Sequence, residues 1–221
     1  MRVATYNIKH CGVEGPEAIA FVLRRIDADL AGLQEVDVGV DRSGRVDQAR
    51  ALAAATGRHV AFGPAFSYGG GAYGVALLSR WPIRASETVA LPALAEPRAL
   101  LVAEIDAPSG PITAAVTHFG LDPRERIAQA RAVADRLRGR ECAILFGDFN
   151  AARAERAMAI LGETLTDCAA ALGLAPLRTY PADTPTIGID HVFVGAALRP
   201  LAARSEPVAA SDHLPVVVEL G

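Results

Sequence analysis

The sequence predicts an α/β fold in which two β-sheets pack face to face and helices cover their outer sides. Short apolar runs alternate with helical patterns along the whole chain, and no repeat, low-complexity tract or linker divides it. With 221 residues, 51% of them hydrophobic, the chain can bury one large core. Many strands around a single core require two sheets, so we expect one domain that spans residues 1–221.

Residue periodicity, proline and glycine mark the elements in order. Helices are predicted where the helical patterns fall, at residues 16–26, 47–56, 123–137 and 152–161. Pro16 and Glu17 suit the first turn of the first helix, and Gly57 ends the second. Strands are predicted at the apolar runs: residues 2–6, 30–34, 58–66, 74–79, 83–91, 100–105, 112–117, 143–146, 192–194 and 216–220.

Two segments in the second half of the chain show the clearest local signals. A turn sequence at residues 108–111, Pro-Ser-Gly-Pro, joins two predicted strands into a hairpin. In the predicted helix at residues 123–137, an apolar face carries Ile127 and Ala134 while arginines occupy the other face. Gly139 then supplies the stop.

Composition excludes several classes of protein. A formal charge of −3 gives no general attraction to polyanions, so a non-specific nucleic-acid coat is not expected. Cys11, Cys142 and Cys168 are odd in number and lack CxxC spacing, which indicates neither a disulfide framework nor a thiolate zinc site. The first strand begins at Arg2, which leaves no room for a signal peptide, and no apolar run approaches the roughly 20 residues that span a bilayer. We therefore expect a cytoplasmic monomer.

Acidic, amide and imidazole side chains stand at the ends of the apolar runs. They are Asn7, Glu35, His118, Asp148, Asn150, Asp190 and the acid–imidazole pair of the segment Ser211-Asp212-His213-Leu214-Pro215. Because alternate strand residues share a face, Asn7 is expected to point with Lys9, and Asp148 with Asn150 if the chain stays extended, while Phe149 points away. Adjacent strand residues face opposite sides, so we expect His213 to contact Asp190 instead of Asp212.

A cluster of these carboxylates requires a counter-charge. If Glu35, Asp148, Asp190 and Asp212 converge, each pair about 5 Å apart repels by roughly 3 kcal/mol at an effective dielectric near 20. A divalent cation removes this repulsion, and oxygen-rich ligands suit magnesium or manganese better than zinc.

Several motifs resemble, in order, those of the endonuclease/exonuclease/phosphatase family. They are Thr5-Tyr6-Asn7-Ile8, Leu33-Gln34-Glu35-Val36, Gly74-Val75-Ala76-Leu77-Leu78-Ser79, Thr117-His118, Gly147-Asp148-Phe149-Asn150, Ile189-Asp190-His191-Val192-Phe193 and Ser211-Asp212-His213. The resemblance spans residues 2–219. It implies a four-layered α/β sandwich and hydrolysis of a phosphoester that depends on Mg²⁺ or Mn²⁺.

The resemblance also implies roles for individual residues. Glu35 is the principal metal ligand, with Asn7 close by and Asp212 contributing. Asp148 orients or deprotonates the attacking water, or binds metal in one stage, and Asn150 binds phosphoryl oxygens. His213 contacts the phosphate or acts as the base with support from Asp190, and His118 donates to the phosphate or the leaving oxygen. The identity of the base stays open.

Three further residues are candidates for contact with substrate. Lys9 stands where some family members carry an acid; it either meets a substrate phosphate or balances the carboxylates, which counts against a second metal site. Arg98 stands where relatives often place a substrate-contacting arginine, and Tyr73, beside a glycine-rich rim loop at residues 69–71, is expected to stack on substrate. The remaining histidines, His10, His59 and His191, are expected at the surface or in loops.

Two classes of function compete for this sequence. The first is a phosphodiesterase or phosphatase, for which a small phosphoester is preferred over DNA because the chain is short and acidic, with no basic cluster in a loop. The alternative within this class is a nuclease that acts on DNA. The second is a non-catalytic binding module on the same fold, which the completeness of the polar set disfavours.

Overall fold

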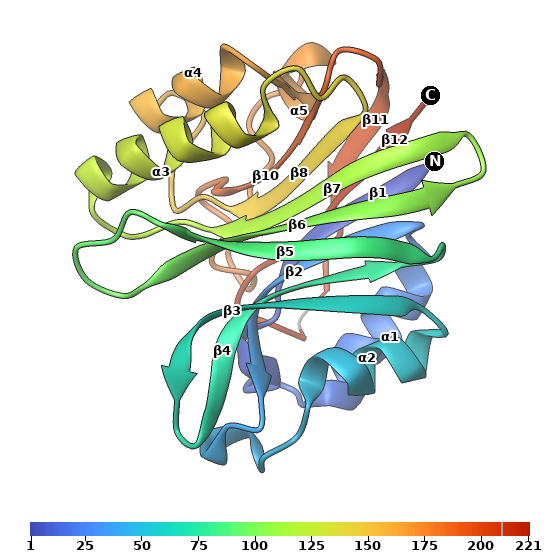
Figure 1. Cartoon of the computed structure of the whole chain (residues 1–221), viewed down its shortest axis with the longest axis vertical. Coiled ribbons are helices and arrows are strands. Elements are labelled where there is room, and N and C mark those ends of the chain that lie inside the picture. Colours follow the sequence, from blue (N-terminus) through green and yellow to red (C-terminus); the bar gives the residue numbers. More distant parts are fainter. Residues whose placement is uncertain (209) are drawn as a thin grey trace.

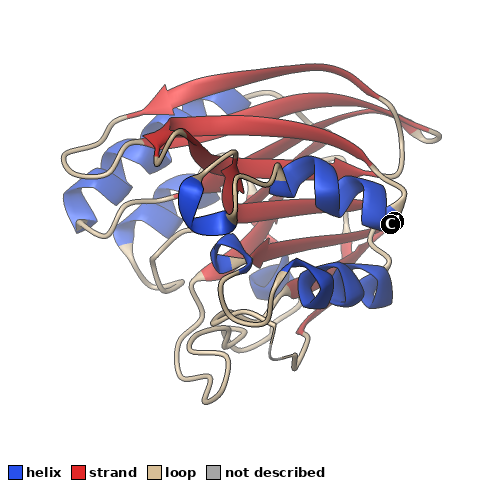
Figure 2. Cartoon of the chain, turned by 90° about the horizontal axis from the view of Figure 1, so that it is seen from below, coloured by secondary structure: helices blue, strands red, loops and turns tan. Residues whose placement is uncertain are grey.

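A computed structural model of the chain describes residues 1–208 and 210–221. Within them, two six-stranded sheets pack against each other, and helices cover both outer faces (Figures 1 and 2). The elements are β1 (Arg2–Asn7), η1 (Lys9–Cys11), α1 (Pro16–Ile26), β2 (Leu30–Val38), η2 (Asp41–Ser43), α2 (Gln48–Thr56), β3 (His59–Tyr68), β4 (Gly71–Ser79), β5 (Ile83–Leu91), β6 (Arg98–Ala107), β7 (Gly110–His118), α3 (Pro123–Leu137), β8 (Ala143–Asp148), α4 (Arg156–Gly162), β9 (Thr166–Asp167), α5 (Cys168–Ala171), β10 (Asp190–Val194), β11 (Pro200–Ser205) and β12 (Val216–Leu220).

The strand order separates the chain into two sheets. The first sheet runs β11-β12-β1-β2-β4-β3, and the second runs β5-β6-β7-β8-β10-β9. Helices α1 and α2 pack on the outer face of the first sheet through residues such as Ile19 and Leu52. Helices α3 and α4 pack on the outer face of the second sheet through residues such as Val133 and Leu161. The predicted four-layered sandwich is therefore confirmed.

The central core lies between the two sheets. Leu30 and Leu77 of the first sheet pack in one cluster with Val116 and Phe146 of the second. The sheets approach closely where Gly32 faces Phe146, because a Cβ at position 32 would lie 2.4 Å from the Phe146 Cβ. A glycine is needed here because any larger residue would meet the Phe146 side chain.

Strand register brings polar residues to one end of this interface. Strand β7 pairs in parallel with β8 so that His118 lies opposite Asp148, and antiparallel β10 places Asp190 opposite Asp148 as well. In the other sheet, Asn7 ends β1 beside Gln34 of β2. His118, Asp148, Asp190 and Asn7 continue the strand rows that fill the central core further back, so these four polar side chains extend the apolar interface into a cleft.

Most predicted elements are confirmed, and the differences have local causes. The predicted helix at residues 152–161 begins at Arg156, because Glu155 folds back to accept a hydrogen bond from the Ala152 N–H. Strand β11 was not predicted, since its edge position leaves it mostly exposed and without an apolar face. The short β9 and α5 also carried no periodic signal. The glycine-rich segment at residues 69–71 is the tight turn of the β3–β4 hairpin.

No helix in the described part of the chain is long and apolar enough to cross a membrane.

Candidate active site

The polar ends of strands from both sheets line a cleft of about 570 Å³. Most residues predicted for the site form its walls: Glu35, Tyr73, Arg98, His118, Asp148, Asn150, Asp212 and His213. The other three predicted residues, Asn7, Lys9 and Asp190, each bond to one of these wall residues. The structure therefore brings all the predicted site residues together.

A buried cluster of two carboxylates and an imidazole forms the floor of the cleft. His213 Nδ1 lies 2.9 Å from Asp190 Oδ2, and His213 Nε2 lies 3.7 Å from Asp148 Oδ2. One ligand atom from each residue falls within 4.8 Å of the others, a spacing that a metal ion can bridge. The contact between His213 and Asp190, expected from sequence, is confirmed.

The electrostatics of this cluster follow from burial and proximity. Burial alone lowers the pKa of His213, but the charge and hydrogen bond of Asp190, helped by Asp148, raise it to about 9. Burial, together with the charge of Asp190, raises the pKa of Asp148 to about 7. His213 is thus an imidazolium at neutral pH, and Asp148 can exchange a proton near neutrality.

Asn7 connects this cluster to Glu35 in the other sheet. The Asn7 Nδ2 amide donates to Asp148 Oδ2 at 2.9 Å and to Glu35 Oε1 at 3.0 Å. Asn7 is completely buried, so its amide is fixed in this bridging position. Two carboxylates from different sheets are held on the same amide group.

A β-bulge turns Glu35 into the cleft. Regular alternation along β2 would place Glu35 with Ala31 and Leu33, which face helices α1 and α2. The pairing of β2 with β4 shifts register between Leu33 and Val36, and Glu35 has a left-handed backbone with φ of +56°. An outlier of this kind re-aims a side chain and is common beside active sites.

Lys9 reaches the site by a different route from the one the sequence predicted. Strand β1 ends at Asn7, and Lys9 lies in the η1 turn with φ of +43°, so the expected strand alternation is wrong here. Its Nζ nevertheless lies 2.5 Å from Asp212 Oδ2, and this hydrogen bond raises the pKa of Lys9. Of the two roles left open for Lys9, the balancing of carboxylates is the one this contact fits.

His118 forms the second imidazole of the cleft, and its environment keeps it neutral. Its pKa lies well below the ordinary value, because of burial first and then the charges of Arg98 and His213. Arg98 Nη1 lies 3.2 Å from His118 Nδ1, and since a guanidinium can only donate, Nδ1 accepts. His118 Nε2 lies 3.5 Å from Asp148 Oδ2.

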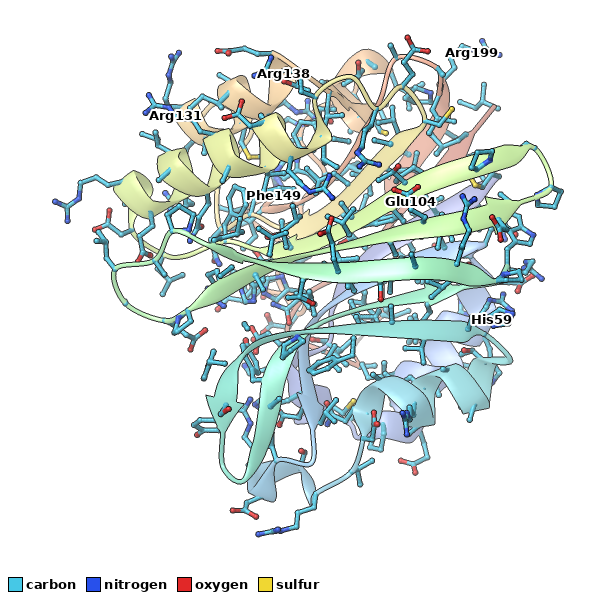
Figure 3. All side chains as sticks on the ribbon, viewed as in Figure 1. His59, Glu104, Arg131, Arg138, Phe149 and Arg199 are labelled. Carbon is cyan, nitrogen blue, oxygen red and sulfur yellow. The ribbon has the colours of Figure 1, made fainter. Side chains whose placement is uncertain are left out.

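Asn150 lies beside His118, although the chain does not stay extended to reach it. Asn150 has a φ of +48°, and its N–H donates to Asp148 Oδ1 at 3.0 Å, which closes a turn after β8. Its amide Nδ2 lies 3.1 Å from His118 Nε2. Phe149 points to the opposite side as expected, into the core beneath α3, and is labelled in Figure 3.

One expectation about the remaining histidines is wrong. His191 is buried on β10, with Nδ1 3.3 Å from Asp167 Oδ2 and Nε2 3.3 Å from the Ala151 carbonyl. It faces the helical side of the sheet, because its neighbour Asp190 faces the cleft. His59, labelled in Figure 3, is exposed and His10 is half-buried, as expected for surface residues.

The donor set at the floor of the cleft fits a divalent cation. It is dominated by the carboxylate oxygens of Asp148 and Asp190, which are the ligands that such ions prefer. Asp190 Oδ1 is buried without a hydrogen-bond partner, so the cluster retains unused acceptor capacity.

Sequence reasoning missed one wall of the cleft. Arg42, Phe66 and Tyr68 also line it, as does Tyr180, whose ring packs 4.8 Å from the His213 ring. The only local signal for this wall was the aromatic residues that flank the glycine turn at residues 69–71. Whether these side chains meet at the cleft depends on how the β3–β4 hairpin packs, and residue periodicity carries no information about that packing.

Solved structures share this architecture. An endonuclease/exonuclease/phosphatase from Beutenbergia cavernae DSM 12333 matches with a TM-score of 0.80 at 26% identity, over 100% of this chain and 71% of that chain. The mannosyl-6-phosphatase Bt3783 of Bacteroides thetaiotaomicron VPI-5482 matches with a TM-score of 0.82 at 19% identity, over 100% of this chain and 99% of that chain. TDP2 of D. rerio, complexed with single strand DNA product, matches with a TM-score of 0.77 at 19% identity, over 100% of this chain and 98% of that chain.

The fold and the sequence together identify the class of enzyme, a phosphoester hydrolase. The sequence profile of the Endonuclease/Exonuclease/phosphatase family matches residues 4–213, nearly the whole chain, and the protein belongs to that family. Enzymes of this family typically use divalent metal ions. No curated protein matches the sequence significantly.

Proposed function

We propose that the protein hydrolyses a phosphodiester with Mg²⁺ or Mn²⁺, by in-line attack of water. The observation that carries this proposal is that Asp148, Asp190 and His213 converge at one cleft. The Asn7 amide, which donates to both Asp148 and Glu35, connects Glu35 to this cluster. The oxygen-rich set favours magnesium or manganese over zinc.

Glu35 is the principal metal-binding residue in this proposal, with Asn7 and Asp212 beside it. Asp212 already pairs with Lys9, so Glu35 retains the freer carboxylate. When bound, the cation supplies positive charge to the phosphoryl oxygens and lowers the pKa of water.

The remaining residues divide the proton chemistry according to their electrostatics. Asp148, oriented by the Asn7 amide, accepts the proton of the attacking water, because its pKa of about 7 suits a base that works near neutrality. The His213 imidazolium, fixed by Asp190, stabilises negative charge on the phosphate. Neutral His118 donates to the phosphate or the leaving oxygen, and Asn150 binds a phosphoryl oxygen.

The cleft favours a small phosphoester over DNA. Its volume of about 570 Å³ suits a small molecule. Glu35, Glu96, Asp148 and Asp212 outnumber the guanidinium groups of Arg42 and Arg98 in its walls. A long polyanion would meet repulsion beyond the reacting phosphate, whereas a small ester places one phosphate at the floor.

A chelator and a single substitution test the proposal. The wild-type protein should hydrolyse bis-p-nitrophenyl phosphate with Mg²⁺ or Mn²⁺, and lose this activity in chelator. Asp148→Ala should reduce kcat by at least about 10²-fold, the usual contribution of a positioned base. Asp167→Asn is a matched control, because Asp167 pairs with His191 away from the cleft. Activity that is insensitive to both chelator and Asp148→Ala contradicts the proposal.

A substrate panel separates the small phosphoester from the nuclease alternative. It compares plasmid DNA, abasic oligonucleotide, RNA, phosphomonoesters and lipid phosphodiesters at low and moderate salt. We expect the most efficient turnover on a small phosphodiester. Efficient DNA cleavage that weakens steeply with salt would instead establish a nuclease, because phosphate contacts make binding depend on salt.

A further inference from the structure

One wall of the cleft carries side chains that the proposed hydrolysis does not use. Arg42 of η2 and Phe66 and Tyr68 of β3 line this wall, next to Tyr73 of β4. We call these four residues the aromatic wall. None of them belongs to the buried acid–imidazole cluster.

The members of the aromatic wall stack on one another. The Arg42 guanidinium lies over the Tyr68 ring, 4.8 Å from its centroid, and 5.4 Å from that of Tyr73. Phe66 packs edge-on to Tyr68 at 6.2 Å and tilted to Tyr73 at 5.2 Å. Cation–π and edge-to-face contacts of this kind fix the relative orientation of the flat groups.

A buried ion pair holds the guanidinium in place. Asp37 is fully buried and accepts from both Nε and Nη2 of Arg42, each at 2.9 Å. The Asp37 N–H in turn donates to Gln48 Oε1 at 2.9 Å. A two-pronged contact with a buried carboxylate is geometrically specific, so Arg42 is held at the cleft instead of moving freely in solvent.

The hairpin tip that carries Tyr68 is fixed as well. The Asp41 N–H donates to the Gly69 carbonyl at 2.8 Å, which ties the loop of Arg42 to the turn after Tyr68. At Gly71 a Cβ would lie 2.2 Å from the Val38 carbonyl oxygen, so the backbones touch directly. Tyr68 nevertheless remains 46% exposed. An exposed aromatic ring on a rigid support is a preorganised surface for stacking.

We propose that the aromatic wall binds a planar, uncharged ring, a nucleobase or a similar ring, that the substrate carries on the side of its phosphate opposite the leaving group. Tyrosine rings and arginine guanidiniums are the side chains on which such rings stack. The excess of carboxylates in the cleft favours a group without further negative charge. The substrate class is then a nucleotide-like phosphodiester with its phosphate at the floor and its ring on the wall. This inference rests on the proposed function.

Two substrates with the same leaving group test the wall. The p-nitrophenyl ester of thymidine 5′-monophosphate carries a base, whereas methyl p-nitrophenyl phosphate carries only a methyl group in its place. Tyr68→Ala should lower kcat/KM for the thymidine ester by about tenfold or more and leave the methyl ester within twofold. Tyr68→Phe keeps the ring and should retain the wild-type preference. An equal change on both substrates, or none on either, would overturn the inference.

A matched control and a binding measurement complete the test. Phe21→Ala removes another exposed ring near an arginine, Arg25, on helix α1 away from the cleft walls, and should change neither substrate. Titration of thymidine 5′-monophosphate into the protein should give a Kd at least about tenfold weaker for Tyr68→Ala. This binding measurement does not require turnover, so it tests stacking on the aromatic wall even if the wild-type protein hydrolyses neither ester. Equal affinity of the wild-type protein and Tyr68→Ala for thymidine 5′-monophosphate would refute the proposal that the aromatic wall binds the base.

Discussion

Replacing Asp190 by asparagine should convert His213 from a cation to a neutral imidazole. In the wild-type protein, the pKa of His213 is about 9 because the charge and hydrogen bond of Asp190 outweigh burial. Asparagine has nearly the same shape but no charge. Burial then dominates, and we expect the His213 pKa to fall to about its ordinary 6.5 or below.

The size of the effect follows from this shift. A pKa raised from 6.5 to about 9 corresponds to about 3 kcal/mol, at roughly 1.4 kcal/mol for each tenfold change. Because the folded-state pKa is raised, this stabilisation is complete below pH 6.5 and disappears as pH rises through about 9. The unfolding free energy of the wild-type protein should fall over that window, and that of Asp190→Asn should not. The pKa of Asp148 is about 7, so its own contribution to the pH dependence of stability falls mainly below pH 7, outside this window.

The assay is a histidine titration by NMR in the presence of chelator, with the His213 signal assigned from His213→Gln. Asp167→Asn is the matched control, since it alters the other buried acid–histidine pair and should leave His213 near 9. The activity of Asp190→Asn at pH 7 should fall by about 10²-fold, because the cation at the phosphate is lost. A His213 midpoint that remains above 8 in Asp190→Asn would refute the reasoning.

Two other substitutions test the metal site and the packing of the sheets. Lys9→Gln removes the ammonium beside Asp212 and should tighten Mg²⁺ binding by about tenfold in calorimetry, whereas Lys9→Arg should not; weaker binding by Lys9→Gln contradicts the balancing role. Gly32→Ala should lower the urea unfolding free energy by about 1–3 kcal/mol, because its Cβ would lie 2.4 Å from the Phe146 Cβ; a loss below about 0.5 kcal/mol contradicts this packing.

The fold was predictable from sequence because its regular elements carry regular patterns. The inner rows of β1, β7, β8 and β10 alternate as expected, and their polar ends, such as Asp148 and Asp190, are the residues that interrupt apolar runs. The contact of Asp190 with His213 was also predicted, although His213 lies in a bend ahead of β12 and not on a strand, so strand alternation was the wrong reason for it. Residues at the ends of straight strands, such as His118, Asp148 and Asp190, therefore follow the two-residue period of a strand.

What sequence reasoning did not predict is how several of the predicted residues reach the site, because this depends on irregular backbone. Alternation would turn Glu35 away from the cleft, and only a bulge between Leu33 and Val36 reverses it. Lys9 and Asn150 reach the site through positive φ angles, which no sequence pattern in this chain marked. His191 was misplaced because a histidine buried against Asp167 looks the same in sequence as an exposed one.

The two imidazoles of the cleft show how neighbours, and not residue type, assign chemical roles. Both His118 and His213 are buried, and burial lowers the pKa of each. His213 lies 2.9 Å from the Asp190 carboxylate, which holds its proton, whereas His118 lies 3.2 Å from the Arg98 guanidinium, which repels a second charge. One imidazole is thus charged and the other neutral at the same pH. Because Asp148 lies between them, 3.7 Å from His213 Nε2 and 3.5 Å from His118 Nε2, it faces a fixed cation on one side and a neutral imidazole on the other.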